Sequence, residues 1–170
     1  MTENPQLASL EAGLDRLNLD LSSEQTGQLM AYHESLLKWN KAYNLVSRGT
    51  LDKAISHHFL DSLAVAPHLK SGPVLDIGSG AGFPWVVVAV LSGWYIHLVE
   101  SDSRKGAFLG EVNRATQAGA VIHNERIEEL KPFAADVVTA RACAPLSGLL
   151  AYAEPFAADR KKALCFFHKG

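Results

Sequence analysis

The sequence has few of the residues from which metal sites and disulfide frameworks are built. It contains only two cysteines, Cys143 and Cys165, and they form no Cys-x-x-Cys pair. We therefore expect no zinc site and a reducing, cytoplasmic compartment. The adjacent His57 and His58 would lie about 100° apart on a helix, which is poor geometry for sharing one metal ion. We expect both histidines at a helix surface or cap rather than in catalysis.

An excess of positive charge is also absent. The chain carries 16 lysines and arginines against 18 aspartates and glutamates, which gives a formal net charge of −2. A protein that binds the phosphate backbone over a large surface is usually basic overall. The charge balance argues against such a general binder but leaves room for a local basic patch.

No apolar run is long enough to suggest a membrane span. The most apolar stretch, Phe83 to Val99, is interrupted by Pro84, Ser92, Gly93 and His97. Its uninterrupted part is too short to cross a bilayer. No basic segment followed by an apolar one stands at the N-terminus, so no signal peptide is expected. At 170 residues and 48% hydrophobic content, one domain with a substantial core is the natural expectation.

The first 70 residues show helical spacing only. Leucines recur through residues 1–20, and Ser22 with Gln25 forms a capping-box signal. We expect a second helix from there to about Tyr43 and a third from a Thr50 cap to Pro67. Their inward-facing residues would be Leu7, Leu10, Leu14 and Leu17; Leu29, Leu36, Leu37 and Tyr43; and Leu51, Ile55, Phe59 and Leu63.

From residue 71 apolar strand-length runs alternate with helical patterns. The alternation predicts an α/β fold with a parallel sheet covered by helices on both faces. Residues 1–70 are interpreted as a helical appendage on a domain that spans residues 71–170. The expected strands are 74–77, 95–99, 120–123, 135–140 and 163–168, and the expected helices are 84–91, 103–117, 127–130 and 146–156.

A glycine-rich turn follows the first expected strand. Gly78, Gly80 and Gly82 stand at alternate positions, and Asp76 precedes them by two residues. Dinucleotide folds instead use the spacing G-x-G-x-x-G to hold a pyrophosphate. A carboxylate would repel a pyrophosphate but suits S-adenosylmethionine, which carries an ammonium, a sulfonium and a ribose diol. The spacing matches motif I of the class I methyltransferases and favours this donor over a dinucleotide or a ligand-free turn.

Acidic residues end the second expected strand. Glu100 stands where a carboxylate accepts hydrogen bonds from a ribose diol in nucleotide-binding folds. Asp102 competes for this role, although Asp102 or Ser103 is equally suited to cap the following helix. A solvated carboxylate run is the alternative to a ribose site.

Two later loops complete the expected site. In the loop 124–129, Ile127 is placed to pack on an adenine ring, although an exposed helix start explains these residues equally well. In the loop 139–145, Arg141 is the only charge, and its fork suits guanine O6/N7, a phosphate or a structural ion pair. This loop has no N/D-P-P-Y/F motif and no strong base. Cys143 is expected as a small buried residue and Cys165 as a strand residue.

Five segments occur together in one order. The segments are Trp39–Leu45, His58–Ser62, Leu75–Pro84, Thr139–Ala142 and Lys169–Gly170. Together they resemble the glucose-inhibited division protein B family, the bacterial guanine-N7 methyltransferases of small-subunit rRNA. The resemblance extends from about residue 22 to the end of the chain. It implies S-adenosylmethionine as methyl donor and N7 of one guanosine in 16S rRNA, within the small ribosomal subunit, as acceptor.

The resemblance also implies roles for individual residues. The cofactor contacts would be Gly78, Phe83, Ile127, Glu128 and Arg141, with Asp76, Gly80 and Glu100 added by the general class I pattern. Arg141 would be the catalytic residue. The candidate RNA contacts are Arg141, Arg126, Lys169 and Lys41. We expect a monomer without metal or membrane association.

Two departures from the family keep other functions open. The bulky Trp85 follows Gly-Phe-Pro where the family commonly has a small residue, and the family's last strands are absent after Gly170. These features keep a non-catalytic S-adenosylmethionine-binding module as an alternative. The acidic balance keeps a methyltransferase for a small molecule or protein. A dinucleotide oxidoreductase would need a different glycine spacing.

Overall fold

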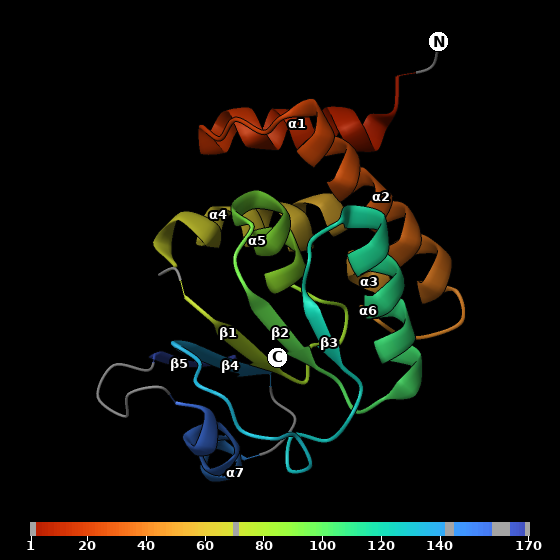
Figure 1. Ribbon diagram of the computed structural model, residues 1–170. Helices are drawn as coiled ribbons and strands as arrows, with labels where there is room; N and C mark the ends of the chain where they lie inside the picture. The colour runs from red at the N-terminus through yellow and green to blue at the C-terminus, as the bar shows by residue number, and fades with distance from the viewer. Residues whose placement is uncertain (1–2, 70–71, 142–144, 158–163, 169–170) are drawn as a thin grey trace.

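A five-stranded parallel sheet forms the centre of the protein (Figure 1). The computed structural model describes residues 3–69, 72–141, 145–157 and 164–168. The strand order is β3-β2-β1-β4-β5, so the chain order reverses between β1 and β4. Ligands of such sheets bind beyond the carboxyl ends of the strands at this reversal. The strands are β1 (Val74–Ile77), β2 (Ile96–Val99), β3 (Val121–His123), β4 (Val137–Arg141) and β5 (Leu164–His168).

Helices cover both faces of the sheet, which confirms the predicted α/β class (Figure 1). One face carries α5 and α6 together with the helices of the first 70 residues, and the other carries α7. The helices are α1 (Pro5–Leu17), α2 (Ser23–Asn40), α3 (Arg48–Leu51), α4 (Asp61–Val65), α5 (Trp85–Ser92), α6 (Ser103–Thr116) and α7 (Leu146–Ala153).

The predicted cap of the second helix is confirmed, but the predicted end is wrong. The Ser22 hydroxyl accepts the Gln25 N–H, and the Gln25 side chain accepts the Ser22 N–H. The helix ends at Asn40 because the Asn40 carboxamide oxygen accepts the N–H groups of Leu45 and Val46, both at 3.0 Å. These bonds turn the chain before Tyr43, which lies half-buried outside the helix.

The third predicted helix is divided into short pieces. It starts at Arg48 rather than after a Thr50 cap, because the Thr50 hydroxyl bonds back to the Ser47 carbonyl at 3.1 Å. A π-helix, Ile55–Leu60, and a 3₁₀ turn, Ala66–His68, flank α4. The wider turn lets Phe59 and Leu60 both point inward, so the expected stripe is buried except for the half-buried Leu51.

The helices of the first 70 residues share a core with the sheet domain. Leu10, Leu36 and Phe59 belong to the same buried cluster as Val74 of β1 and Phe108 of α6. Leu75 and Ile77 point the other way and pack with Leu149 of α7. This alternation along β1 is the period of two that a strand imposes. The division at residue 70 remains a prediction.

Aromatic rings join the helical layer to the glycine-rich turn. The Tyr32 hydroxyl of α2 donates a hydrogen bond to the carbonyl of Ala81. The Tyr32 ring stacks on Phe83 with centroids 4.9 Å apart, and the His58 ring stacks on Phe83 at 5.0 Å. The N-terminal helices therefore support the turn from behind.

Within the described ranges, no helix combines the length and apolarity that a membrane span requires. In the same part of the chain, no three or more His, Cys, Asp or Glu side chains gather as a metal site would require.

Replacing Tyr32 by Phe tests the support of the turn. The change leaves the buried Ala81 carbonyl without its hydroxyl donor and should lower the free energy of unfolding by about 1–3 kcal/mol. Tyr43→Phe is the matched control, because that ring is half-exposed and outside the core cluster. Urea denaturation of both variants measures the difference. Equal stability of Tyr32→Phe and the unsubstituted protein would contradict the role of this bond.

Candidate functional site

The glycine-rich turn adopts the backbone that its sequence predicts. The φ angles of Gly78, Gly80 and Gly82 are 74°, 54° and 89°. The N–H groups of Gly78 and Ser79 bond the Val99 carbonyl of β2 at 2.8 and 3.1 Å. A Cβ at Gly82 would lie 2.8 Å from the Tyr32 hydroxyl. A side chain at position 82 would require a residue with positive φ and would clash with the Tyr32 hydroxyl, so glycine is required there.

Glu100 is tied directly to this turn. Its carboxylate oxygen accepts the Gly80 N–H at 3.2 Å, and its side chain is buried, with the residue 7% exposed. Asn124, from the loop after β3, donates to the Glu100 carbonyl at 2.7 Å. The carboxylate therefore has a fixed place at the ends of β1 and β2. Its contact with a ribose remains a prediction.

A cavity of about 220 Å³ opens beyond the ends of β1 and β2. We call it the donor cavity. It brings together three of the predicted cofactor contacts, Gly78, Ile127 and Glu128. Its lining comprises Ile77, Gly78, Val99, Ser101, Glu125, Arg126, Ile127, Glu128 and Tyr152.

The loop after β3 forms one wall of the donor cavity. Ile127 is buried in the same apolar cluster as Ile77 and Val99, and all three line the donor cavity. The backbone N–H of Glu128 itself and the Tyr152 hydroxyl hold the pKa of the Glu128 carboxyl below its ordinary value. The predicted helix at 127–130 is wrong, because only turn bonds such as Glu129 N–H to the Arg126 carbonyl (3.0 Å) form there.

Asp76 stands at the end of a buried chain of hydrogen bonds. The Trp85 indole N–H donates to the Thr139 hydroxyl at 2.8 Å, and that hydroxyl donates to an Asp76 carboxylate oxygen at 2.7 Å. Asp76 and Thr139 are direct neighbours in the register of β1 and β4. All three residues are buried, with exposed fractions of 2% for Trp85 and 3% for Asp76. Trp85 is therefore packed inward and does not line the donor cavity.

Two other expected residues lie on the helical side of the turn. The Phe83 ring is buried between Tyr32 and His58, so a cofactor contact at this position would use the backbone. The prediction that His57 and His58 both lie at a helix surface or cap is confirmed in part. His57 is exposed, whereas His58 stacks on Phe83 and its Nε2 lies 3.1 Å from the Thr50 hydroxyl.

The remaining candidate residues lie in or next to strands β4 and β5. Arg141 is the last residue of β4, one position beyond the Ile77–Ala140 pair, so its backbone lies at the switch point. Its side chain, Cys143 and Lys169 lie outside the described part of the protein. Cys165 lies in β5, as predicted.

The donor cavity fits S-adenosylmethionine better than a dinucleotide. Its charged residues are Glu125, Arg126 and Glu128, so carboxylates outnumber cations where a pyrophosphate would need the reverse. Drug-sized ligands occupy pockets of roughly 300–1,000 Å³. A cavity of about 220 Å³ suits one part of such a ligand rather than the whole of it.

The sequence profile of one family, GidB (rRNA small subunit methyltransferase G), matches residues 25–170. The matched range contains the glycine-rich turn, Glu100 and the loop after β3. The chain belongs to this family. The resemblance inferred from the five ordered segments is thereby confirmed.

Known proteins support both the family and the fold. The chain is 47% identical over 152 residues to a ribosomal RNA small subunit methyltransferase G of Paramagnetospirillum magneticum, covering 88% of this chain and 73% of the relative. It is also 47% identical over 152 residues to that of Rhodospirillum centenum, covering 88% and 69%. The structure of coclaurine N-methyltransferase bound to N-methylheliamine and SAH shares the fold, with a TM-score of 0.57 and 13% identity over 96% of this chain and 57% of that chain.

Sequence reasoning missed three residues that shape the site. Tyr152, which lines the donor cavity and bonds Glu128, lies in the predicted helix 146–156 with no spacing that ties it to the cavity. Asn124 belongs to a loop rich in charged residues, and nothing in its spacing points to the Glu100 carbonyl. Thr139 could have been found, because Asp76 and Thr139 are polar residues inside two mainly apolar strands that the expected parallel sheet can pair.

Replacing Thr139 by Val tests the buried chain. Valine has nearly the same shape but removes the donor to Asp76 and the acceptor of Trp85, so the free energy of unfolding should fall by about 1–3 kcal/mol. Thr139→Ser keeps the hydroxyl and should retain most of the stability. Urea denaturation distinguishes the two variants. A valine variant as stable as the serine variant would show that the hydroxyl does not support Asp76.

Proposed function

We propose that this chain transfers a methyl group from S-adenosylmethionine to N7 of a guanosine in 16S rRNA. The observation that carries the proposal is the family match over residues 25–170, which includes every residue that lines the donor cavity. The relatives of Paramagnetospirillum and Rhodospirillum bear the name of the same rRNA methyltransferase.

We assign the donor to the carboxyl end of β1 and β2. In this proposal Gly78 and Gly80 allow its close approach to the backbone, Glu100 accepts hydrogen bonds from its ribose hydroxyls, and Ile127 packs against its adenine; the positive φ angles of the glycines, the buried Glu100 carboxylate and the cavity lining support it. Glu128 and Phe83 complete the proposed contacts. The Thr139 hydroxyl holds the Asp76 carboxylate two residues before the turn, and the Ser79 hydroxyl of the turn donates to the Asp76 carbonyl. When bound, the donor supplies an electrophilic methyl group on a sulfonium.

The acceptor chemistry agrees with the residues at the end of β4. Guanine N7 presents an in-plane lone pair, so no proton has to leave before it attacks. The lone pair forms the new N–CH₃ bond while the S–CH₃ bond breaks and its electrons stay on sulfur. Catalysis then requires alignment rather than a base. We assign Arg141 to hold the target through guanine O6 or a neighbouring phosphate, which leaves N7 open.

The buried position of Trp85 bears on the alternative of a non-catalytic binding module. That alternative rested on the size of Trp85 and on the family's last strands. Trp85 is 2% exposed and its indole N–H bonds Thr139. Because the side chain occupies the core, it gives no support to a blocked site.

A methyl-transfer assay with Glu100→Gln tests the proposal. Small ribosomal subunits that lack the modification and radiolabelled donor should give label at guanine N7 with the unsubstituted chain. The amide keeps an acceptor for the Gly80 N–H but loses the charge that accepts a diol, so the donor KM should rise by about tenfold or more. Glu129→Gln is the control, since Glu129 is exposed and does not line the donor cavity.

Two results would contradict the proposal. Label on another atom or another molecule would refute the acceptor assignment. An unchanged donor KM in Glu100→Gln would refute the ribose contact.

A further inference from the structure

A second cavity lies beside the donor cavity. Its volume is about 320 Å³, and it lies between the turn at the end of α2 and the start of α6. We call it the Arg104 cavity. Ser101 lines the donor cavity and the next residue, Asp102, lines this one, so the two cavities flank one short segment. The lining comprises Ala42, Tyr43, Asn44, Asp102, Arg104 and Lys105.

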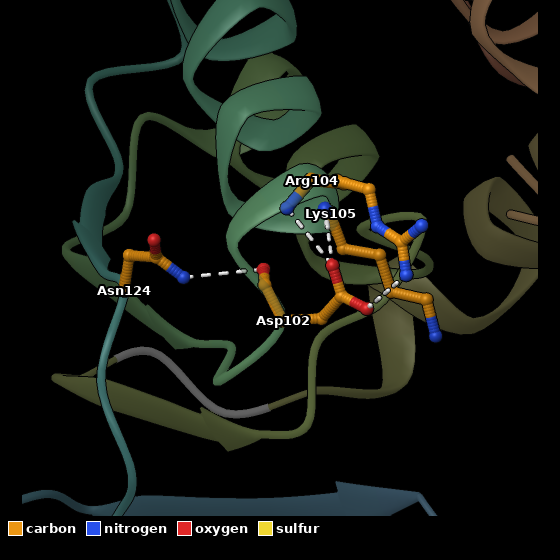
Figure 2. A network of polar contacts seen from close by, with 4 residues as sticks. All are labelled: Asp102, Arg104, Lys105 and Asn124. Atoms are coloured by element: carbon orange, nitrogen blue, oxygen red, sulfur yellow. Dashed lines mark hydrogen bonds and ion pairs between the residues drawn. The ribbon is translucent and has the colours of Figure 1, made fainter. Parts of the chain in front are cut away.

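Hydrogen bonds fix the segment between the two cavities (Figure 2). An Asp102 carboxylate oxygen accepts the backbone N–H groups of Arg104 and Lys105 at 2.8 and 3.2 Å. The Asn124 amide donates to the Asp102 carbonyl at 3.2 Å and to the Glu100 carbonyl at 2.7 Å. A Cβ at Gly106 would lie 2.5 Å from the Asn124 amide nitrogen, so glycine makes this approach possible. The walls of the Arg104 cavity are thus set by the same loop that forms the donor cavity.

Two contacts hold the Arg104 guanidinium in place. It lies 5.4 Å above the centroid of the Tyr43 ring, and its Nη2 lies 3.5 Å from the second Asp102 oxygen. A guanidinium has five N–H donors, so one carboxylate contact leaves several for a ligand. Its side chain is 63% exposed. Arg104 is therefore oriented by the protein yet accessible from solvent.

The charge of the Arg104 cavity is positive. Two cations, Arg104 and Lys105, face one carboxylate, Asp102. The N–H groups of Lys105 and Arg104 hold the pKa of Asp102 below its ordinary value, and its oxygens already face donors. Among the described residues, no carboxylate forms an ion pair with Lys105. This is a local basic patch in a chain whose formal net charge is −2.

We propose that the Arg104 cavity binds a backbone phosphate of the RNA substrate. Phosphate oxygens match the planar donors of Arg104, the ammonium of Lys105 and the amide of Asn44. The cavity lies next to the donor cavity, so a strand held there by its phosphate stays within reach of the methyl donor. The inference rests on the proposed function, because it names how that substrate is held.

The salt dependence of RNA binding tests the proposal. For single strands the slope of log K against log[salt] changes by about 0.7 for each phosphate that the protein neutralises. Arg104→Gln and Lys105→Gln should each weaken binding to unmodified small ribosomal subunits and flatten the slope by about this amount. Arg114→Gln is the matched control, since Arg114 is exposed in the last turn of the same helix. Donor affinity should stay unchanged in all three variants.

A second arginine variant separates charge from folding. Arg104→Lys keeps the charge and should keep most of the slope, even if loss of the contact with Tyr43 lowers stability. Slopes of Arg104→Gln and Lys105→Gln equal to that of Arg114→Gln would overturn the inference. Methyl transfer to rRNA would then still support the proposed function. Conversely, flattened slopes without any transfer by the unsubstituted chain would support the phosphate site and refute the function.

Discussion

The glycine-rich turn Gly78–Gly82 is held from both sides, and the site depends on this restraint. Three glycines with positive φ lose much conformational freedom when they are fixed in one geometry. The Tyr32 hydroxyl holds the turn through the Ala81 carbonyl, and the Glu100 carboxylate holds it through the Gly80 N–H. The turn is thereby organised before any ligand arrives. Preorganisation of this kind reduces the cost of binding.

Because of this restraint, the N-terminal helices help to form the candidate site. Tyr32 and His58 come from the first 70 residues, and both stack on Phe83 at the end of the turn. In the same helical layer, the turn after α2 contains Tyr43, which lines the Arg104 cavity. One layer thus supports the proposed donor site and contributes a wall to the proposed phosphate site. The short segment from Glu100 to Asp102 joins the two.

The parts of the fold that were predictable have local causes. Alternating strand and helix patterns gave the parallel sheet, and the glycine spacing gave the positive φ angles, because each depends on neighbouring residues. The wrong boundaries came from side chains that bond the backbone across a turn. Asn40 ends its helix by accepting from Leu45 and Val46, and nothing in the apolar spacing indicates that.

Contacts between distant segments were harder to predict. Tyr152 meets Glu128 only after α7 packs on the sheet, and Trp85 meets Thr139 only through the pairing of β1 with β4. Trp85 shows the consequence most clearly. Its size is one reason to consider a non-catalytic binding module, whereas in the structure its indole N–H donates to the buried Thr139 hydroxyl.

The central claim is that the restrained turn and the donor cavity form a site for S-adenosylmethionine. Isothermal titration calorimetry of the full chain tests it most directly. We predict binding of one S-adenosylmethionine per chain, competed by S-adenosylhomocysteine and unaffected by NAD. Absence of donor binding, or competition by NAD, would contradict the account.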